Sequence, residues 1–174
     1  MPSLKRKKTL GPEHVHELLA KFDTLMVGTY EQTGDVPKLH ARPMAVAHVE
    51  EDSSIVFFTA IDTGKVEEAL SPRRGHVSGQ SRRRYLSAVG DFEIIKDVER
   101  AKALWKPQFS VWFDGPEDPK LVLMIFHPEE VELWDSSGVK GLKYAFQMAR
   151  ALVTGERPDR DEDPEQHERV ALIH

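Results

Sequence analysis

The sequence contains no cysteine and no long apolar run. Without cysteine, the chain has no disulfides, thiolate metal ligands or thiol catalysis, and it fits a cytoplasmic protein, the location that we predict. The longest apolar run, residues 121–126, is far too short to cross a bilayer. The basic start of the chain lacks the apolar segment of a signal peptide. We therefore expect no membrane partner.

Several motifs that would assign a chemistry are also missing. The chain has no Gly-x-Gly-x-x-Gly fingerprint and no Walker-type loop, so a dinucleotide site of the Rossmann type is not expected. The residues around Ser78 read Gly-His-Val-Ser-Gly, which lacks the spacing of a nucleophile elbow. His14 and His16 are two apart on a predicted helix and point to different sides. No metal site is predicted.

The composition is that of one soluble globular domain. The chain has 174 residues, of which 40% are hydrophobic and 30% are charged. A net charge of -5 argues against a general nucleic-acid binder. Arginines cluster at 73, 74 and 82–84, and the segment 156–168 is mostly acidic. Such blocks are typical of solvated faces, and a basic groove for a phosphorylated ligand is the alternative.

The hydrophobic pattern predicts short helices between strands. Helices are expected at 12–22, 63–70 and 97–105, and strands at 24–30, 39–49, 54–60, 75–80 and 85–95, followed by a hairpin of 120–127 and 130–134. Asp97 is the expected cap of the third helix, and Gly90 is the expected bulge. The fold class is mostly β, a barrel of six or seven mainly antiparallel strands with short flanking helices.

Three segments define the predicted organisation of the chain. Residues 1–11 are expected to be a disordered basic N-terminus, residues 12–135 the barrel domain, and residues 136–174 a C-terminal helix followed by an acidic tail.

An Arg on one predicted strand, a Thr at the end of the next and a Lys just inside the following helix are placed where they could converge. Residues 40–44 read His-Ala-Arg-Pro-Met, residues 57–59 read Phe-Phe-Thr, and residues 63–65 read Thr-Gly-Lys. Arg42 offers a planar fork, and Lys65, just inside a helix, offers a compact charge. Both suit a phosphate monoester, and Thr63 is placed to cap the helix and to bind phosphate. The residues alone therefore suggest a phosphate-bearing cofactor lying across a small β-barrel.

These segments occur in the order found in one known family. Together with Leu104-Trp105, Pro107, Trp112-Phe113 and Pro-Glu-Asp-Pro at 116–119, they resemble the general stress protein 26 branch of the pyridoxamine 5'-phosphate oxidase-like flavoproteins. The resemblance implies an FMN-binding split β-barrel and a homodimer with FMN at the subunit interface. It also implies a set of cofactor-binding residues, which are Arg42, Pro43, Met44, Phe58, Thr59, Thr63, Lys65, Gln80, Trp105 and Trp112.

Each of these residues also has an ordinary structural interpretation. Arg42 fits a solvated edge strand, Phe58 fits the core, Lys65 fits a helix surface, and either Trp fits simple packing. The resemblance favours the flavin contacts, with Pro43 and Met44 along the ring. No catalytic residue is predicted, since a strand histidine such as His40 is more often structural than a proton donor.

The predicted function is electron transfer between bound FMN and an unknown small molecule. True pyridoxamine-phosphate oxidase activity is not expected, because residues 134–174 do not match the substrate segment of that enzyme. Three alternatives stay open: a flavin carrier or stress sensor without turnover, a barrel that binds haem or a deazaflavin, and a structural dimer with a vestigial pocket. A haem would favour an axial histidine, for which His40, His48, His76 and His127 are the candidates.

Overall fold

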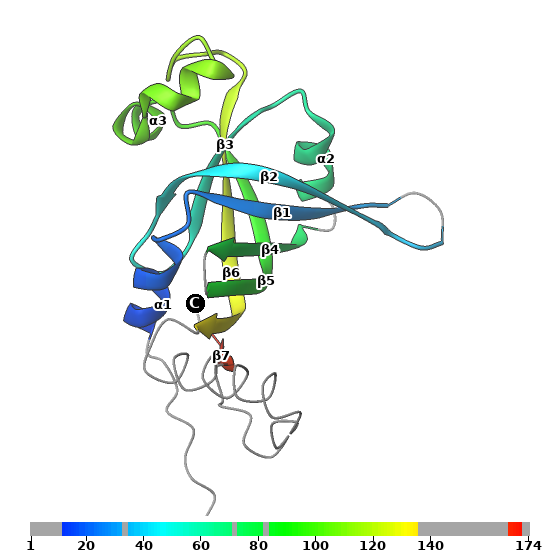
Figure 1. The fold of residues 1–174 in the computed structure, drawn as a ribbon. Helices are drawn as coiled ribbons and strands as arrows, with labels where there is room; N and C mark the ends of the chain where they lie inside the picture. Colours follow the sequence, from blue (N-terminus) through cyan, green and yellow to red (C-terminus); the bar gives the residue numbers. More distant parts are fainter. Residues whose placement is uncertain (1–11, 33–34, 71–72, 82–83, 136–166, 172–174) are drawn as a thin grey trace, which may run out of the picture.

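A seven-stranded antiparallel sheet makes up most of the structure, a computed structural model that describes residues 12–32, 35–70, 73–81, 84–135 and 167–171 (Figure 1). The strands are β1 (Thr24–Glu31), β2 (Lys38–Val49), β3 (Ile55–Ala60), β4 (Arg74–Ser81), β5 (Arg84–Ile95), β6 (Leu121–Asp135) and β7 (His167–Ala171). The helices are α1 (Pro12–Leu19), α2 (Gly64–Leu70), α3 (Val98–Leu104) and the 3-10 turn η1 (Pro107–Val111).

The sheet closes on itself as a barrel. Its strand order is β3-β2-β1-β4-β5-β6-β7, and β3 also pairs with β6, so the first six of these strands form a ring. The predicted mostly-β antiparallel barrel with short helices is therefore confirmed. Asp97 caps α3 as expected, since its side chain accepts a hydrogen bond from the amide of Arg100.

Strand β3 and residues 121–126 of β6 are buried on both faces. Phe57, Met124 and Phe126 belong to the cluster inside the barrel, which α1 closes at one end. Phe58 and Leu123, which are next to Phe57 and Met124 in sequence, belong to a second cluster that packs against α3 and η1. This arrangement explains the unbroken apolar run of β3, because a strand covered on both sides has no polar face.

The predicted hairpin of 120–127 and 130–134 is wrong. Both segments belong to the single strand β6, which pairs with β5 from Leu123 to Asp135. The Pro128-Glu129 pair suggests a turn, but the register shifts there by one residue opposite Val89 and Gly90. Proline is tolerated inside a sheet at such a bulge. The expected irregularity at Gly90 is thus confirmed, and it keeps the strand continuous.

The predicted acidic tail at the end of the chain contains a short strand, β7. Residues of β7 pair with Glu130–Trp134 of β6 and cover that edge of the sheet. The predicted C-terminal helix and the predicted disordered N-terminus lie outside the described residues. Within the part of the chain that the structure describes, the helices are too short to cross a membrane.

Replacing Gly90 by Ala will destabilise the fold. A Cβ atom at this position would lie 2.0 Å from the carbonyl oxygen of His127 and 2.9 Å from Cα of Pro128, so backbone must move. We expect a loss of about 1–3 kcal/mol in the free energy of unfolding, measured by urea denaturation.

Gly64→Ala is the matched control for this substitution. Gly64 begins α2, and a Cβ there meets no atom within 4 Å. The variant should therefore be as stable as the wild type or slightly more stable. Equal stabilities for Gly90→Ala and the wild type would show that the bulge does not require glycine.

Candidate functional site

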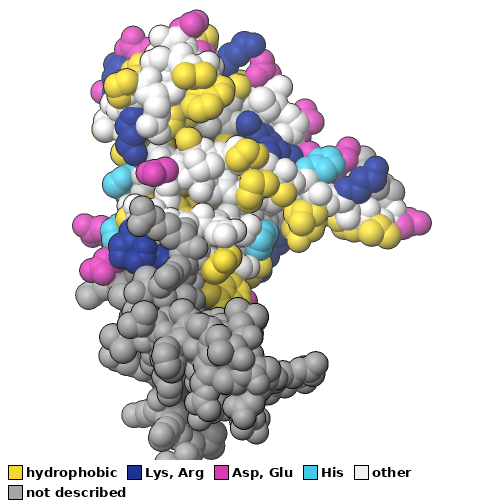
Figure 2. All heavy atoms as spheres, in the orientation of Figure 1, with side chains coloured by type: hydrophobic (Ala, Val, Ile, Leu, Met, Phe, Trp, Pro, Cys, Tyr) yellow, Lys and Arg dark blue, Asp and Glu magenta, His cyan; other side chains and the backbone are white. Residues whose placement is uncertain are grey.

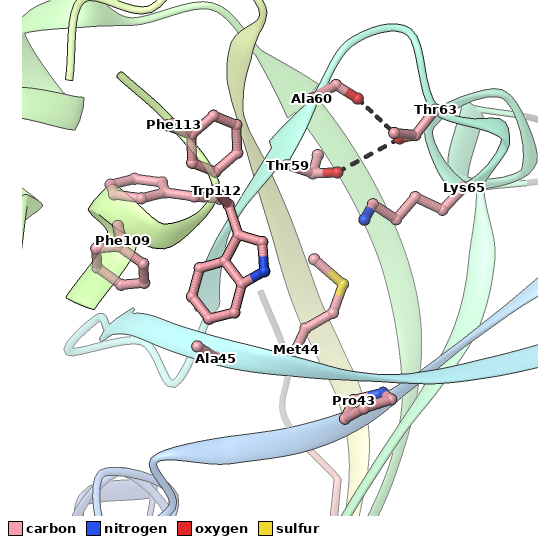
Figure 3. A pocket seen from close by; sticks show the side chains of 11 residues that line it. Pro43, Met44, Ala45, Thr59, Ala60, Thr63, Lys65, Phe109, Trp112 and Phe113 are labelled. Atoms are coloured by element: carbon pink, nitrogen blue, oxygen red, sulfur yellow. Dashed lines mark hydrogen bonds between the residues drawn. The ribbon is translucent and has the colours of Figure 1, made fainter. Parts of the chain in front are cut away.

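An open cleft lies between β2, the end of β3, the start of α2 and the segment that follows η1 (Figure 3). Its volume is about 300 Å³. The lining residues are Pro43, Met44, Ala45, Phe58, Thr59, Ala60, Thr63, Lys65, Phe109, Trp112 and Phe113. Seven of the ten predicted cofactor-binding residues therefore meet in one place, although they come from three separate stretches of the chain.

One side of the cleft is aromatic. Phe109 on η1 is buried, and its ring lies 4.8 Å from that of Phe58 in an edge-on contact. Trp112 ends η1 and is 65% exposed, although it also lines the cleft. In Figure 3 its indole lies beside the side chain of Met44, which also lines the cleft. This wall offers a flat apolar surface to a planar ring.

Trp105 lies behind this wall. Its ring is 6.0 Å from Phe58 and nearly parallel to it, and it is 5.9 Å from Phe109. Trp105 therefore supports two of the lining residues but does not line the cleft itself. Of the two predicted tryptophans, the structure brings only Trp112 to the opening.

The other end of the cleft is polar. The Thr63 hydroxyl donates to the carbonyl of Ala60 at 2.7 Å and lies 3.5 Å from the hydroxyl of Thr59. The Lys65 side chain leaves α2 and points between Thr59 and Met44 (Figure 3). Among the described residues that line the cleft, Lys65 is the one with a charged side chain, so this end carries positive charge.

Lys65 is half-buried and forms no ion pair with any carboxylate of the described residues. Burial lowers the pKa of its ammonium group, and the neighbouring positive charge of Arg42 lowers it further. An anionic ligand bound here would stabilise the charged ammonium group and so oppose both effects on its pKa. The cleft is therefore suited to a ligand with a planar ring and an anionic group.

Arg42 lies beside the cleft, and its guanidinium group forms an ion pair with the carboxylate of Glu68. Its Nη2 donates to Oε2 of Glu68 at 2.9 Å, and its Nη1 donates to the Thr29 hydroxyl at 2.9 Å. The Thr29 hydroxyl also donates to Oε2 of Glu68, and Nδ1 of His40 contacts Oε1 at 2.9 Å. The Glu68 carboxylate thus joins α2 to both β1 and β2.

The same contacts keep Glu68 ionised. Burial alone would raise its pKa, since its side chain is only 13% exposed. The hydrogen bonds from Thr29, Arg42 and His40, with the charge of Arg42, outweigh burial and lower the pKa from 4.5 to about 2. Arg42 is accordingly fixed in position rather than free to move in solvent.

Gln80 lies away from the cleft. It is exposed on β4, where its amide nitrogen is 3.5 Å from the Tyr85 hydroxyl. The four candidate haem ligands also lie outside it: His76 contacts Ser87 at 3.0 Å, and His127 contacts Ser54 at 2.9 Å.

Sequence reasoning missed Ala45, Ala60, Phe109 and Phe113 as lining residues, and Glu68 as the partner of Arg42. One feature of the sequence pointed to Glu68. It follows Lys65 by three residues, so both side chains face the same side of α2. Phe109 and Phe113 flank Trp112 closely in sequence, but their direction depends on η1, which was expected to be a loop.

A family model described as "Pyridoxamine 5'-phosphate oxidase like" matches residues 11–159. The chain belongs to the pyridoxamine 5'-phosphate oxidase-like family. The match covers β1–β6 and all four helical segments, and β7 lies beyond it.

Individual relatives agree with this assignment. General stress protein 26 of Bacillus subtilis (strain 168) is 27% identical over 107 residues, which are 57% of this chain and 73% of that protein. A general stress protein 26 structure from Jannaschia sp. CCS1 has a TM-score of 0.64 at 23% identity, covering 91% of this chain and 96% of its own. The general stress FMN/FAD binding protein of Xanthomonas citri has a TM-score of 0.59 at 26% identity, covering 73% and 89%.

Glu68→Gln will destabilise the protein at neutral pH. Because the folded-state pKa lies below the usual value, the carboxylate stabilises the fold above about pH 4.5, and this contribution is lost as the pH falls towards 2. We expect the free energy of unfolding at pH 7 to fall by about 1.5–3 kcal/mol. The difference between variant and wild type should shrink steadily in acid.

Glu67→Gln provides the control, since Glu67 is the exposed neighbour on the same helix. Thermal melts of all three proteins across pH 2 to 7 test the claim. A difference between Glu68→Gln and wild type that is constant with pH would contradict it.

Proposed function

We propose that this chain is an FMN-binding flavoprotein that transfers electrons to or from a small molecule. The observation that carries this proposal is Lys65, whose ammonium group pairs with no carboxylate of the described residues and lies at one end of a cleft whose other side is aromatic. A flavin mononucleotide has the matching parts, a planar ring system and a terminal phosphate. The name of the Xanthomonas citri relative, which includes FMN and FAD, supports a flavin in this fold.

The residues present fit such a cofactor. Lys65, with Arg42 beside it, would hold the phosphate, because both groups are positively charged and Glu68 neutralises only one of them. Met44 and Trp112 would pack on the ring, and the Thr59 hydroxyl would bind its polar edge. When bound, the flavin supplies the electron-transfer chemistry, and these residues orient it and exclude water.

The site is best completed by a second copy of the chain. A volume of about 300 Å³ is at the lower end of the range for small-molecule sites, and the cleft is open on one side. The outer face of the sheet also carries exposed hydrophobic residues on three strands: Met26 on β1, Leu39 on β2, and Tyr85 and Val89 on β5. Figure 2 shows hydrophobic side chains exposed beside basic ones on one face of the barrel. We infer a homodimer with FMN at its interface.

Lys65→Ala will weaken binding of FMN more than binding of riboflavin, because only FMN carries the phosphate. Loss of a charge-assisted contact of about 1.5–3 kcal/mol corresponds to roughly a tenfold to hundredfold increase in Kd for FMN. Riboflavin affinity should be nearly unchanged. Fluorescence titration of both ligands measures these values.

Lys106→Ala controls for the loss of positive charge, since Lys106 is exposed and lies outside the cleft. Equal losses of FMN and riboflavin affinity in Lys65→Ala would remove Lys65 from the phosphate site.

Val89→Lys will convert the dimer into a monomer. Val89 lies on β5 and is 38% exposed, and a charge buried at an interface without a partner is costly. Val36→Lys, a change at a 75% exposed position near the tip of the β1–β2 hairpin, should leave the dimer intact. Sedimentation at several concentrations reports the mass. A wild-type monomer that binds FMN tightly would refute the shared site.

A further inference from the structure

We propose that Lys65 is a reactive amine that captures planar aromatic aldehydes in the cleft as an imine. The inference goes beyond flavin binding, since it requires the cleft and its lysine but no bound cofactor. It assigns to Lys65 a covalent chemistry in addition to the electrostatic role proposed above.

The surroundings of Lys65 differ from those of other lysines in the described chain. Lys102 and Lys120 are ion-paired, with Glu117 at 2.7 Å and Asp62 at 2.6 Å, and these bonds raise the pKa of both ammonium groups. The ammonium of Lys96 donates to three backbone carbonyls, with distances between 2.6 and 3.2 Å. A lysine held in this way keeps its proton and lacks a free lone pair.

Lys65 has the opposite environment. It is half-buried, none of the described residues that line its cleft is a carboxylate, and the neighbouring charged group on β2 is the cation Arg42. The Glu68 carboxylate already binds Arg42, Thr29 and His40. Burial and a neighbouring positive charge both favour the neutral amine, which is the nucleophilic form.

The lining of the cleft also favours a planar aromatic aldehyde as the reaction partner of Lys65. A planar ring can pack against Met44 and Trp112 in the cleft, and the Lys65 amine, which points between Thr59 and Met44, can then reach a carbonyl on that ring (Figure 3). The amine nitrogen adds to the carbonyl carbon, the oxygen leaves as water, and a C=N bond replaces the C=O bond. No oxidation or reduction occurs. The Thr59 hydroxyl lies at the same end and can hydrogen-bond the carbonyl oxygen.

The probe is pyridoxal 5'-phosphate, a planar aromatic aldehyde, added in limiting amount to the flavin-free full-length protein. Borohydride then reduces any imine to a stable secondary amine, and peptide mass spectrometry locates it. We expect Lys65 to be labelled first and most completely, and to label at lower pH than the exposed Lys106. Lys65→Met should remove this adduct, and Lys120→Met should keep it.

Labelling spread evenly over exposed lysines, or an unchanged rate of labelling in Lys65→Met, would overturn the proposal. The site is mapped in the wild-type protein, so the test does not depend on the folding of a variant. A parallel sample with FMN separates the two proposals. Protection of Lys65 by FMN supports both of them, whereas full labelling without any FMN binding supports the reactive lysine and refutes the flavin site.

Discussion

One strand, β6, sets the arrangement of nearly every other element. Its first half pairs with β3 on one side and with β5 on the other, and this double pairing closes the barrel. Its second half pairs with β7. A strand of fifteen residues would bend or break at Pro128 without the register shift opposite Gly90. The barrel, and with it the position of β3 beside the cleft, therefore depends on one residue without a side chain.

A second constraint acts on the site itself. The Glu68 carboxylate receives hydrogen bonds from β1 and β2, and so it holds α2 against the barrel. This contact fixes Lys65, one turn earlier on the same helix, beside Arg42. The positive charges of Lys65 and Arg42 are thereby kept close together, and the one carboxylate of Glu68 pairs with Arg42. The repulsion between these two positive charges costs free energy, and an anionic ligand bound beside them would remove that cost.

Local sequence signals predicted most of the fold and the core of the site. The alternating strands, the Asp97 cap and the ordered motifs around Arg42, Thr59 and Lys65 all depend on residues close in sequence. The failures concern long-range geometry. Pro128 carries a local turn signal, and only pairing with β5 shows that it is a bulge. Whether Trp105 or Trp112 reaches the cleft depends on how η1 packs, because both residues bracket the same turn.

The barrel of this family carries a cleft in this chain that combines an aromatic wall with the ammonium group of Lys65. We propose that a flavin binds there, and the most direct test is the visible absorption spectrum of the purified protein after FMN is added and the excess is removed. Retained flavin bands, close to one flavin per chain, are the predicted result. A colourless protein would contradict the account, and a Soret band would replace the flavin with haem.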